Sequence, residues 1–383
     1  MTRLSSNNPN AQQLPRKEYN SDKLNWKYPL KKIFRSRFKN GVMLNTDYKS
    51  LEIFIAAGIS QDRSMLQTLL DGKDYHEQSA REAFDIPDDE EVPKPKRTQA
   101  KKVSFGLIYG MGPEGLANDL SAEGIKINET EAEELIQKVL NSKPGLEDTI
   151  NKTQEMARTK HYVETIAGFR RRLGTVSSSD KGQANRALRQ SFNARVQGSG
   201  AYCTNNALII ADRLFQQLHL KSKIVMTVHD SIVTDVHPDE IEIVGKVMKG
   251  AFEHLKIPQL LNNKADGLNV PKKYDLGNGY FRLPLSGEME LGCNYNDDID
   301  YDLDLIKKYV NPYQCCKWQY ERIKAKEVLN TALGNIGKND KLSEVEVEQA
   351  KEKAQEDYDL AIKEIEINEK PYLVGVDTSE SEA

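Results

Sequence analysis

The sequence Arg97-Thr-Gln-Ala-Lys101-Lys-Val-Ser-Phe105-Gly-Leu-Ile-Tyr109-Gly110 carries two cations and two aromatic rings at intervals of four residues. On a helix these four side chains would share one face, because positions i and i+4 lie one above the other. A core face would not hold Arg97 and Lys101, since unpaired buried charge is costly. A solvated face explains a bare Arg-x3-Lys pair but not the aromatic continuation. The stripe suits a ligand that is anionic at one end and flat at the other, such as a nucleoside triphosphate.

The chain of 383 residues is long enough for two or three domains. Hydrophobic residues make up 38% and charged residues 29%, with a formal net charge of -4. The overall charge does not indicate a nucleic-acid partner, so such a site must come from local clusters of cations. The four cysteines lack C-x-x-C spacing and no apolar run reaches membrane-spanning length, so we expect a cytoplasmic protein with reduced thiols and no membrane contact.

The segment around Asp47 predicts a strand followed by a helix. Apolar and polar residues alternate over 42–46, as in a half-buried strand, and a helical pattern covers residues 49–57. A carboxylate at such a junction is often only the N-cap of the helix. Asp47 therefore gains a chemical role only if a second carboxylate lies beside it.

A second carboxylate occurs at the tip of a predicted hairpin. Runs of β-branched residues at 223–228 and 231–236 flank His229 and Asp230. Two strands, one ending in Asp47 and one turning at Asp230, can bring both acids to one edge of a sheet. Hard divalent cations take oxygen ligands of this kind. The simpler interpretation of Asp230 is turn chemistry.

Three other segments carry candidate residues that also have simpler interpretations. His76 lies in a polar stretch and, taken alone, is a surface histidine. The amides and prolines of residues 3–15 fit either a disordered leader or a row of donors along a phosphate backbone. Residues 183–215 give the longest helical pattern, with three polar side chains again spaced by four: Arg189, Asn193 and Gln197.

The remaining segments predict local structure. Residues 162–165 are strand-like, and the three arginines at 170–172 are expected in a basic loop. After an acidic stretch at 297–304, residues 318–366 are nearly all helix formers with a break at 334–341, which predicts a helical hairpin. We expect its interface to pair one set of apolar residues with another: Ile323, Val328 and Leu329 against Val345, Ala354 and Ile362.

Together these stretches resemble the polymerase domain of family A DNA polymerases, the class of bacterial DNA polymerase I and its phage relatives. Asp47-Tyr-Lys-Ser-Leu-Glu52 is similar to the first catalytic motif, Arg97-x3-Lys101-x3-Phe105-Gly-x2-Tyr109-Gly110 to the nucleotide-binding fingers helix, and Val228-His229-Asp230 to the second catalytic motif. Three further matches are Arg3-Leu-Ser-Ser-x2-Pro9-Asn10-x-Gln12, Tyr162-Val-Glu-Thr-x2-Gly168 and Arg189-x3-Asn193-x3-Gln197-Gly198. The six motifs follow the family's order over residues 1–296.

The resemblance implies an α+β fold, in which a small antiparallel palm sheet carries both acids and helical fingers lie between them in sequence. It implies four parts: residues 1–60 begin the palm, 61–182 form the fingers, 183–299 complete the palm, and 300–383 form a C-terminal helical extension. The implied reaction is DNA synthesis from dNTPs on primer–template DNA.

The resemblance also assigns residues. Asp47, Asp230 and the backbone carbonyl of Tyr48 would hold two Mg²⁺ ions about 3.5–4 Å apart. Six residues would contact the dNTP: His76, Arg97, Lys101, Phe105, Tyr109 and Glu52. Of these, Arg97 and Lys101 would also be catalytic, and Glu52 would exclude a ribose 2′-hydroxyl. Primer–template DNA would contact residues from three segments: Arg3, Asn10, Gln12, Arg189, Asn193, Gln197 and His229.

The sequence departs from the family pattern at three points. Ser231 stands where the family usually has Glu, and Ile53-Phe54 where bacterial members often carry Leu-Arg. The chain also begins almost at the primer-contact motif. We therefore expect the thumb and the 3′→5′ exonuclease to be absent from this chain and to lie on a separate polypeptide, as in a split polymerase of phage type acting in the bacterial host cytoplasm.

Two alternatives remain. A single-subunit RNA polymerase shares the paired aspartates, but Glu52 would crowd a ribonucleotide, and Phe105 stands where those enzymes are expected to have tyrosine. A non-catalytic DNA-binding or assembly subunit is favoured by the expected lack of a thumb. The complete set of Asp47, Asp230, Arg97 and Lys101 speaks against it.

Overall fold

The computed structural model of the protein describes residues 4, 6, 10, 12, 14, 20–21, 24–25, 30–253, 263–264, 266–338 and 343–375. These residues fall into two compact units. Unit 1 draws on Met1–Ser5, Tyr48–Ala207 and Ala251–Ser286, and unit 2 on Ser6–Asp47, Leu208–Gly250 and Gly287–Ala383. Because both units are discontinuous in sequence, they do not follow the four predicted functional ranges, and that functional division stays a prediction.

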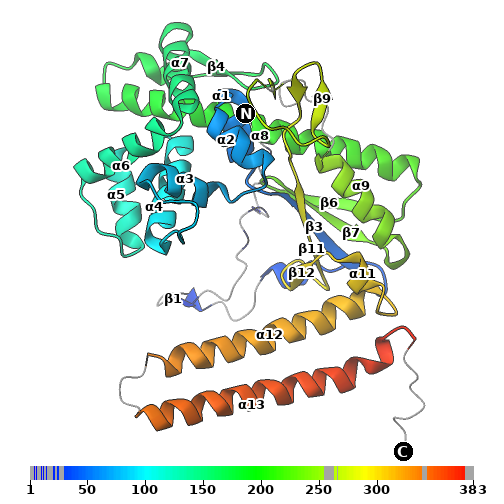
Figure 1. Cartoon of the computed structure of the whole chain (residues 1–383). Coiled ribbons are helices and arrows are strands. Elements are labelled where there is room, and N and C mark those ends of the chain that lie inside the picture. Colours follow the sequence, from blue (N-terminus) through cyan, green and yellow to red (C-terminus); the bar gives the residue numbers. More distant parts are fainter. Residues whose placement is uncertain are drawn as a thin grey trace, which may run out of the picture. The chain divides into compact units, whose positions relative to one another are not determined.

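The sheet of unit 2 has five strands in the order β12-β11-β3-β7-β6 (Figure 1). The strands are β3 (Val42–Tyr48), β6 (Lys223–Val228), β7 (Ser231–Val236), β11 (Gly287–Gly292) and β12 (Asp298–Asp300). Strand β3 is central, and its residues 42–46 are all buried. The sequence pattern predicted a half-buried strand here. The prediction was wrong about burial: β3 lies between β11 and β7, and the residues on both of its faces are buried.

The predicted hairpin is confirmed as β6 and β7. Val228 pairs with Ser231, so His229 and Asp230 form a two-residue turn. His229 adopts a left-handed backbone conformation with φ 58°. All six residues of β7 are buried, which fixes the register of the hairpin against β3.

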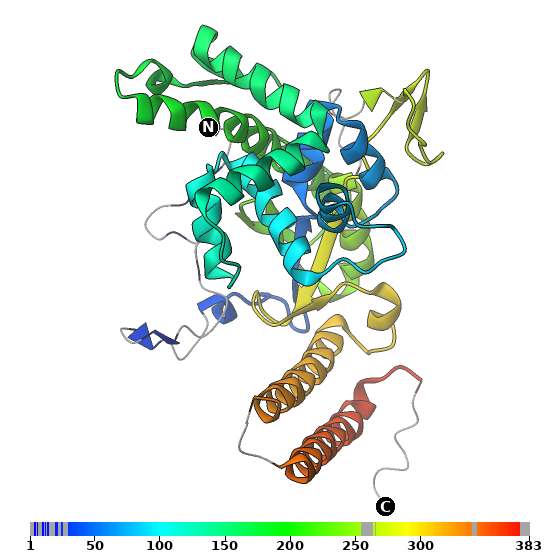
Figure 2. The same ribbon diagram turned by 60° about the vertical axis from the view of Figure 1, so that its left-hand side comes forward.

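The predicted C-terminal hairpin is confirmed as α12 (Pro312–Ile336) and α13 (Glu344–Glu369), which lie side by side in both views (Figures 1 and 2). Its predicted interface was wrong in part, because Val328 and Val345 are 70% and 67% exposed and Ile323 is also exposed. Half-buried positions on the two helices repeat instead at about 3.5-residue spacing, as an antiparallel helix pair requires. They include Ala325, Leu329 and Ala332 on α12, and Val347, Ala354 and Ala361 on α13.

Unit 1 is mainly helical. Its first seven helices are α1 (Leu51–Ser60), α2 (Arg63–Leu70), α3 (Tyr75–Phe84), α4 (Lys94–Tyr109), α5 (Pro113–Ala122), α6 (Glu129–Asn141) and α7 (Pro144–Lys160). Val103 of α4 belongs to one buried cluster with Leu116 and Leu120 of α5 and Leu135 of α6. A second cluster joins Ala80 of α3 to Ala100 of α4. Helix α4 is therefore fixed along its length by its neighbours.

The three arginines at 170–172 form strand β5 (Arg170–Arg172), not the expected loop. They pair with the predicted strand, β4 (Tyr162–Glu164), in an antiparallel register. All three are exposed, so they lack the buried apolar residues by which a sequence pattern identifies a strand. The long helix predicted over 183–215 is confirmed as α8 (Lys181–Gln217).

The other elements are short, apart from α9: β1 (Asn20–Ser21), β2 (Leu24–Asn25), η2 (Leu30–Ile33), η3 (Gly174–Ser177), η4 (Pro238–Glu240), α9 (Ile241–Glu253), β8 (Asn263–Lys264), β9 (Asp275–Gly277), β10 (Tyr280–Phe281), α11 (Leu303–Ile306) and η5 (Lys370–Tyr372). None of the helices in the described part of the chain combines the length and the apolar character of a membrane span. The predicted α+β class with a C-terminal helical hairpin is confirmed.

Candidate active site

The two acids lie on neighbouring strands of the unit 2 sheet. Thr46 of β3 pairs with Ile232 of β7, and the antiparallel register then sets Asp47 opposite Ser231. Asp230 follows one residue further, in the turn that ends β6. Adjacent strands are about 4.8 Å apart, so the two carboxylates belong to the same end of one strand pair. Both residues are half-buried.

The simpler interpretation of Asp47 does not hold. Helix α1 has Ser50 as its N-cap residue, three positions after Asp47, and no side chain caps it. Asp47 is therefore not the N-cap of α1.

The donor chemistry at this edge fits Mg²⁺. No group of three or more His, Cys, Asp or Glu that could hold a metal occurs among the described residues. Mg²⁺ does not need such a cage, because it commonly binds one or two carboxylates and completes its octahedron with water and substrate phosphate oxygens. Tyr48, whose carbonyl was predicted as a ligand, follows Asp47 in β3. Its ring packs against that of Phe252, with the ring centroids 4.4 Å apart.

Helix α4 has local sequence signals at both of its ends. Pro93 is its N-cap and Pro95 lies in its first turn, where proline costs no hydrogen bond. It ends at Gly110, whose φ of 71° is left-handed. A Cβ on Gly110 would lie 2.4 Å from the carbonyl oxygen of Arg189 on α8. Only glycine meets both conditions, so the end of the helix is fixed against α8.

The predicted stripe lies on α4. Lys101 and Tyr109 are exposed, and Arg97 and Phe105 are half-buried. The Phe105 and Tyr109 rings are stacked, with centroids 6.0 Å apart. The Arg97 guanidinium donates a hydrogen bond to the Asp74 carboxylate at 2.6 Å. The stripe thus presents charge at the start of the helix and aromatic surface at its end.

His76 joins this stripe from α3. Its ring centroid is 5.2 Å from that of Phe105. Burial, with smaller contributions from Lys101 and Arg97, lowers the pKa of His76 to about 4, against an opposing effect of Asp74. The imidazole is therefore neutral near pH 7 and can offer a phosphate a hydrogen bond, but not a charge. The interpretation as a solvated surface histidine was wrong.

Glu52 lies in the first turn of α1. The Tyr109 hydroxyl donates a long hydrogen bond of 3.5 Å to its Oε1 atom. Unit 1 therefore brings all six residues predicted to contact the dNTP into one chain of neighbours, from Glu52 through the α4 stripe to His76.

The residues predicted to contact DNA come from three places. Arg189 is exposed on α8, with half-buried Asn193 and Gln197 further along it. The Asn193 Oδ1 atom is buried with no hydrogen-bond partner in the described part of the chain. Arg3 lies outside the described residues.

Three predicted DNA contacts lie in unit 2. The Gln12 amide donates to the carbonyl of Thr227 in β6 at 3.2 Å. This places Gln12 beside the hairpin whose turn holds His229, which is exposed. Asn10 is also exposed, and its Oδ1 accepts the backbone N–H of Gln12 at 3.1 Å.

Sequence reasoning missed two charged residues that support unit 1. Asp74 binds Arg97, and the available signal was its N-cap position three residues before Glu77. Lys143 is fully buried and donates to Glu82 at 2.7 Å, with its ammonium over the Tyr75 ring. No local pattern marks Lys143, because its partner lies 61 residues away.

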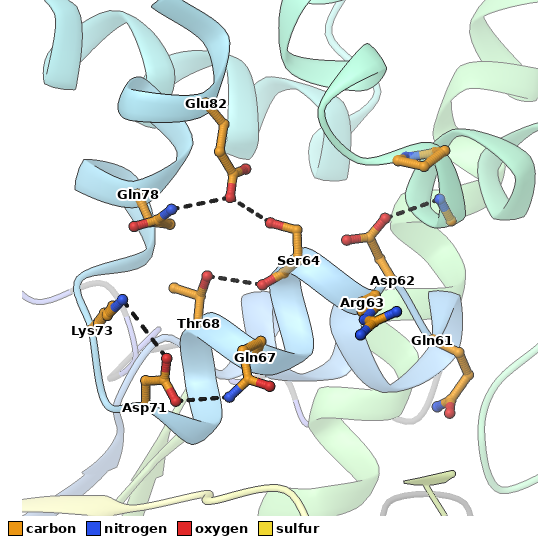
Figure 3. A pocket seen from close by; sticks show the side chains of 12 residues that line it. Gln61, Asp62, Arg63, Ser64, Gln67, Thr68, Asp71, Lys73, Gln78 and Glu82 are labelled. Carbon is orange, nitrogen blue, oxygen red and sulfur yellow. Dashed lines mark hydrogen bonds and ion pairs between the residues drawn. The ribbon is translucent and has the colours of Figure 1, made fainter. Parts of the chain in front are cut away.

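A pocket of about 680 Å³ in unit 1 contains none of the predicted site residues. Figure 3 shows that its polar groups face one another. Ser64 and Gln78 both donate to Glu82, and Gln67 donates to Asp71. These polar groups are therefore paired with one another within the protein.

Comparison with known proteins points to a family of DNA polymerases. The sequence model of DNA polymerase family A matches residues 1–280. A DNA polymerase of Bacillus phage SP01 is 36% identical over 308 residues, which is 80% of this chain and 32% of that protein. DNA polymerase I of Caldicellulosiruptor bescii is 33% identical over 270 residues, 70% of this chain and 30% of that protein. The chain thus spans about a third of the length of these relatives.

Among solved structures, the POL domain of Pol1 from M. smegmatis, in complex with DNA primer-template and dNTP, matches with a TM-score of 0.61 and 26% identity. The match covers 77% of this chain and 46% of that one. The family model's match to residues 1–280 includes α4 and both aspartates and covers most of the sequence: the chain belongs to DNA polymerase family A.

Proposed function

We propose that this chain adds dNTPs to a primer 3′-hydroxyl under the direction of a DNA template, with release of pyrophosphate, in the bacterial host cytoplasm. The observation that carries this proposal is the register of β3 and β7, which sets Asp47 and the Asp230 turn at one end of adjacent strands. Family membership adds support, because a solved relative holds DNA primer-template and dNTP.

Asp47, Asp230 and the Tyr48 carbonyl would hold two Mg²⁺ ions. When bound, the ions would lower the pKa of the primer 3′-hydroxyl and neutralise charge on the leaving pyrophosphate. The two acids supply the anionic oxygens that Mg²⁺ prefers, and the dNTP phosphates would supply others. Ser231, in the family's usual Glu position, is buried and donates its hydroxyl to the Val228 carbonyl at 2.9 Å, so it would only support the turn.

The phosphates would be bound by the cationic end of α4. Arg97 and Lys101 carry permanent charge one helical turn apart, which suits the spread charge of a triphosphate in the transition state. His76 is neutral in the free protein and would donate one hydrogen bond to the same phosphates. The proposed reaction requires these phosphate-binding residues and the two acids to act on the same bound dNTP.

The aromatic end of α4 would receive the nucleoside. Phe105 would stack on the sugar and base, and Tyr109 would lie where the template base enters. Glu52, within reach of the Tyr109 hydroxyl, would occupy the space beneath the ribose and exclude a 2′-hydroxyl. Closure of α4 over a correctly shaped base pair would provide fidelity by induced fit.

Primer–template DNA would contact polar residues from three segments of the chain: Arg3, Asn10, Gln12, Arg189, Asn193, Gln197 and His229. Most of these are amides or cations, which are the usual donors to phosphates and to base edges in the minor groove.

The test is addition of a single nucleotide with protein in excess over primer–template, so that processive synthesis is not required. Wild-type protein with Mg²⁺ should extend the primer by one dNTP. Asp47→Asn and Asp230→Asn should each slow addition by about a thousandfold or more, since each removes a charged metal ligand. DNA binding, measured by fluorescence anisotropy, should persist in both variants.

The matched control is Asp239→Asn. It changes the net charge equally, but the Asp239 side chain is 84% exposed and outside the site. Normal addition by Asp230→Asn would overturn the catalytic assignment. DNA binding without any addition by the wild-type protein would favour the assembly-subunit alternative.

A separate polypeptide with a thumb and a 3′→5′ exonuclease is proposed as the partner in extended synthesis. Mixing this chain with a candidate thumb-bearing protein should lengthen the products on a long template. Full processive synthesis by this chain alone would contradict the proposed split.

A further inference from the structure

Asp74 binds two groups with its two carboxylate oxygens. Its Oδ1 atom accepts the backbone N–H of Glu77 at 2.8 Å and so caps helix α3. Its Oδ2 atom accepts Nη2 of Arg97 at 2.6 Å. One oxygen fixes the carboxylate to the start of α3, and the other fixes the guanidinium at the start of α4.

The two ends of this contact are held by packed elements. Ala80 of α3 and Ala100 of α4 are fully buried in one cluster, which prevents the helices from sliding past each other. One layer further along, His76 and Phe105 bring the same two helices together through their rings. Asp74 thus meets Arg97 with little freedom on the α3 side.

The pair is too exposed to act mainly in stability. The side chains of Arg97 and Asp74 are 42% and 41% exposed, and ion pairs at such positions contribute little to folding. A phosphate approaching from solvent can therefore reach the guanidinium. Although desolvation raises it, the pKa of Asp74 lies below its ordinary value because Arg97 and the Glu77 N–H donate to the carboxylate. Asp74 is an anion at neutral pH.

We infer that Asp74 is a positioning residue that holds the Arg97 guanidinium in place for the incoming triphosphate. This inference rests on the proposed function of Arg97. Arginine has many rotamers, and a guanidinium already aligned loses less freedom when phosphate binds. A guanidinium has five N–H donors, and Arg97 donates to Asp74 through Nη2, so it can donate to the phosphate from its other N–H groups while Asp74 keeps it aligned.

Two substitutions separate positioning from helix capping. Asparagine caps helices as well as aspartate does but lacks its charge, so Asp74→Asn keeps the cap and weakens the hold on Arg97. Glutamate is a poorer cap with the same charge. If the charge on Arg97 is what matters, Asp74→Glu should restore function better than Asp74→Asn.

The experiment is a double-mutant cycle in single-nucleotide addition, with wild type, Asp74→Asn, Arg97→Ala and the double variant. Asp74→Asn should raise KM for the dNTP by about tenfold, the size of one charge-assisted contact, and leave kcat within about twofold. In the Arg97→Ala background the same substitution should change KM by less than about twofold, because Asp74 acts through Arg97. The control Asp302→Asn alters another N-cap aspartate, on α11, and should change nothing.

Magnesium-free dATP binding, measured by calorimetry on the same four proteins, tests the inference without chemistry. A coupling between the two positions is expected there as well. Equal effects of Asp74→Asn with and without Arg97, or no effect in either assay, would overturn the inference. If the wild-type protein binds dATP with this coupling but adds no nucleotide, the proposed function fails and the positioning role stands. If it does not bind dATP, both fail.

Discussion

Helices α4 and α13 both expose apolar or aromatic side chains together with charged side chains, but the net charges of the two helices have opposite signs. Helix α4 carries five basic residues and no acidic one, and its exposed stripe ends in Phe105 and Tyr109. Helix α13 carries ten acidic and three basic residues, with Leu360 and Ile367 exposed on the face opposite α12. The pattern of exposure alone would make both helices candidate binding faces. The sign of the charge favours α4 over α13 for the proposed contact with phosphate.

This difference agrees with the range of residues that the family model matches. The family match covers residues 1–280 and so includes α4 but not α13. If charge and position decide function as we infer, substitutions on α4 and its neighbours should impair nucleotide addition. Substitutions on the outer face of α13 should not.

Among the substitutions that test this comparison, the largest loss of nucleotide addition is expected at Lys101. Lys101→Ala should slow nucleotide addition by about a hundredfold, because one charge that stabilises the triphosphate in the transition state is lost. Rates of single-nucleotide addition at saturating dNTP, together with KM, measure the loss.

The adjacent residue is a control on the same helix. Lys102 pairs with Asp119 and Glu123 of the neighbouring segment at 3.0 and 3.2 Å, and so its charge is already used within the protein. Lys102→Ala should leave nucleotide addition nearly unchanged. Equal losses in the two variants would show that only the total charge of α4 matters, which would break the comparison with α13.

A smaller effect is expected at Glu52, where selectivity and not rate should change. Glu52→Ala opens space next to the Tyr109 hydroxyl, so incorporation of rNTPs should rise relative to dNTPs by about 10–100-fold. Competition between dNTP and rNTP in primer extension measures the ratio. Glu147→Ala removes an acid from the equivalent first turn of α7 and should not alter it. Unchanged discrimination in Glu52→Ala would revive the RNA polymerase alternative.

His76 predicts a dependence of stability on pH. Its pKa is lowered from 6.5 to about 4 by burial first, then by Lys101 and Arg97, against Asp74. The unfolded chain therefore binds a proton between those values that the folded chain excludes. The contribution of His76 to stability is complete above pH 6.5 and is lost as pH falls toward 4.

His76→Gln removes this titration. As pH falls from 6.5 to 4, the unfolding midpoint of the wild type should drop by a few degrees more than that of the variant. At pH 7 the variant should raise KM for dNTP only a few-fold, since an amide N–H replaces a neutral imidazole N–H. Parallel pH curves for the two proteins would show that His76 titrates normally.

Sequence was sufficient where structure is set locally. The spacing on α4, the prolines at its start and Gly110 at its end fix that helix within one segment, and the β-branched runs around Asp230 do the same for the hairpin. The pairing of the Asp47 strand with this hairpin could then be predicted. A strand that ends in an acid and a hairpin whose turn holds an acid can pair in only a few ways in a small sheet.

Sequence failed where partners lie far apart along the chain. The contact of Asp74 with Arg97 spans 23 residues, and that of Lys143 with Glu82 spans 61. The central position of β3 in its sheet depends on β11, which is more than 200 residues away in sequence. On α12, Val328 was assigned to the interface because it is apolar, yet the spacing of the inner positions leaves it outside.

The smallest effect is expected on α13, and it completes the comparison. Leu360→Gln and Ile367→Gln change exposed side chains, so stability should stay within about 0.5 kcal/mol of the wild type, and single-nucleotide addition should be unaltered. Ile365→Gln is the matched change on the inner, half-buried side, where a polar amide would separate α13 from α12. It should lower the unfolding midpoint more than either outer variant. A loss of nucleotide addition in Leu360→Gln or Ile367→Gln, with stability preserved, would mean that an acidic face serves the reaction after all, and charge sign would no longer distinguish the two helices.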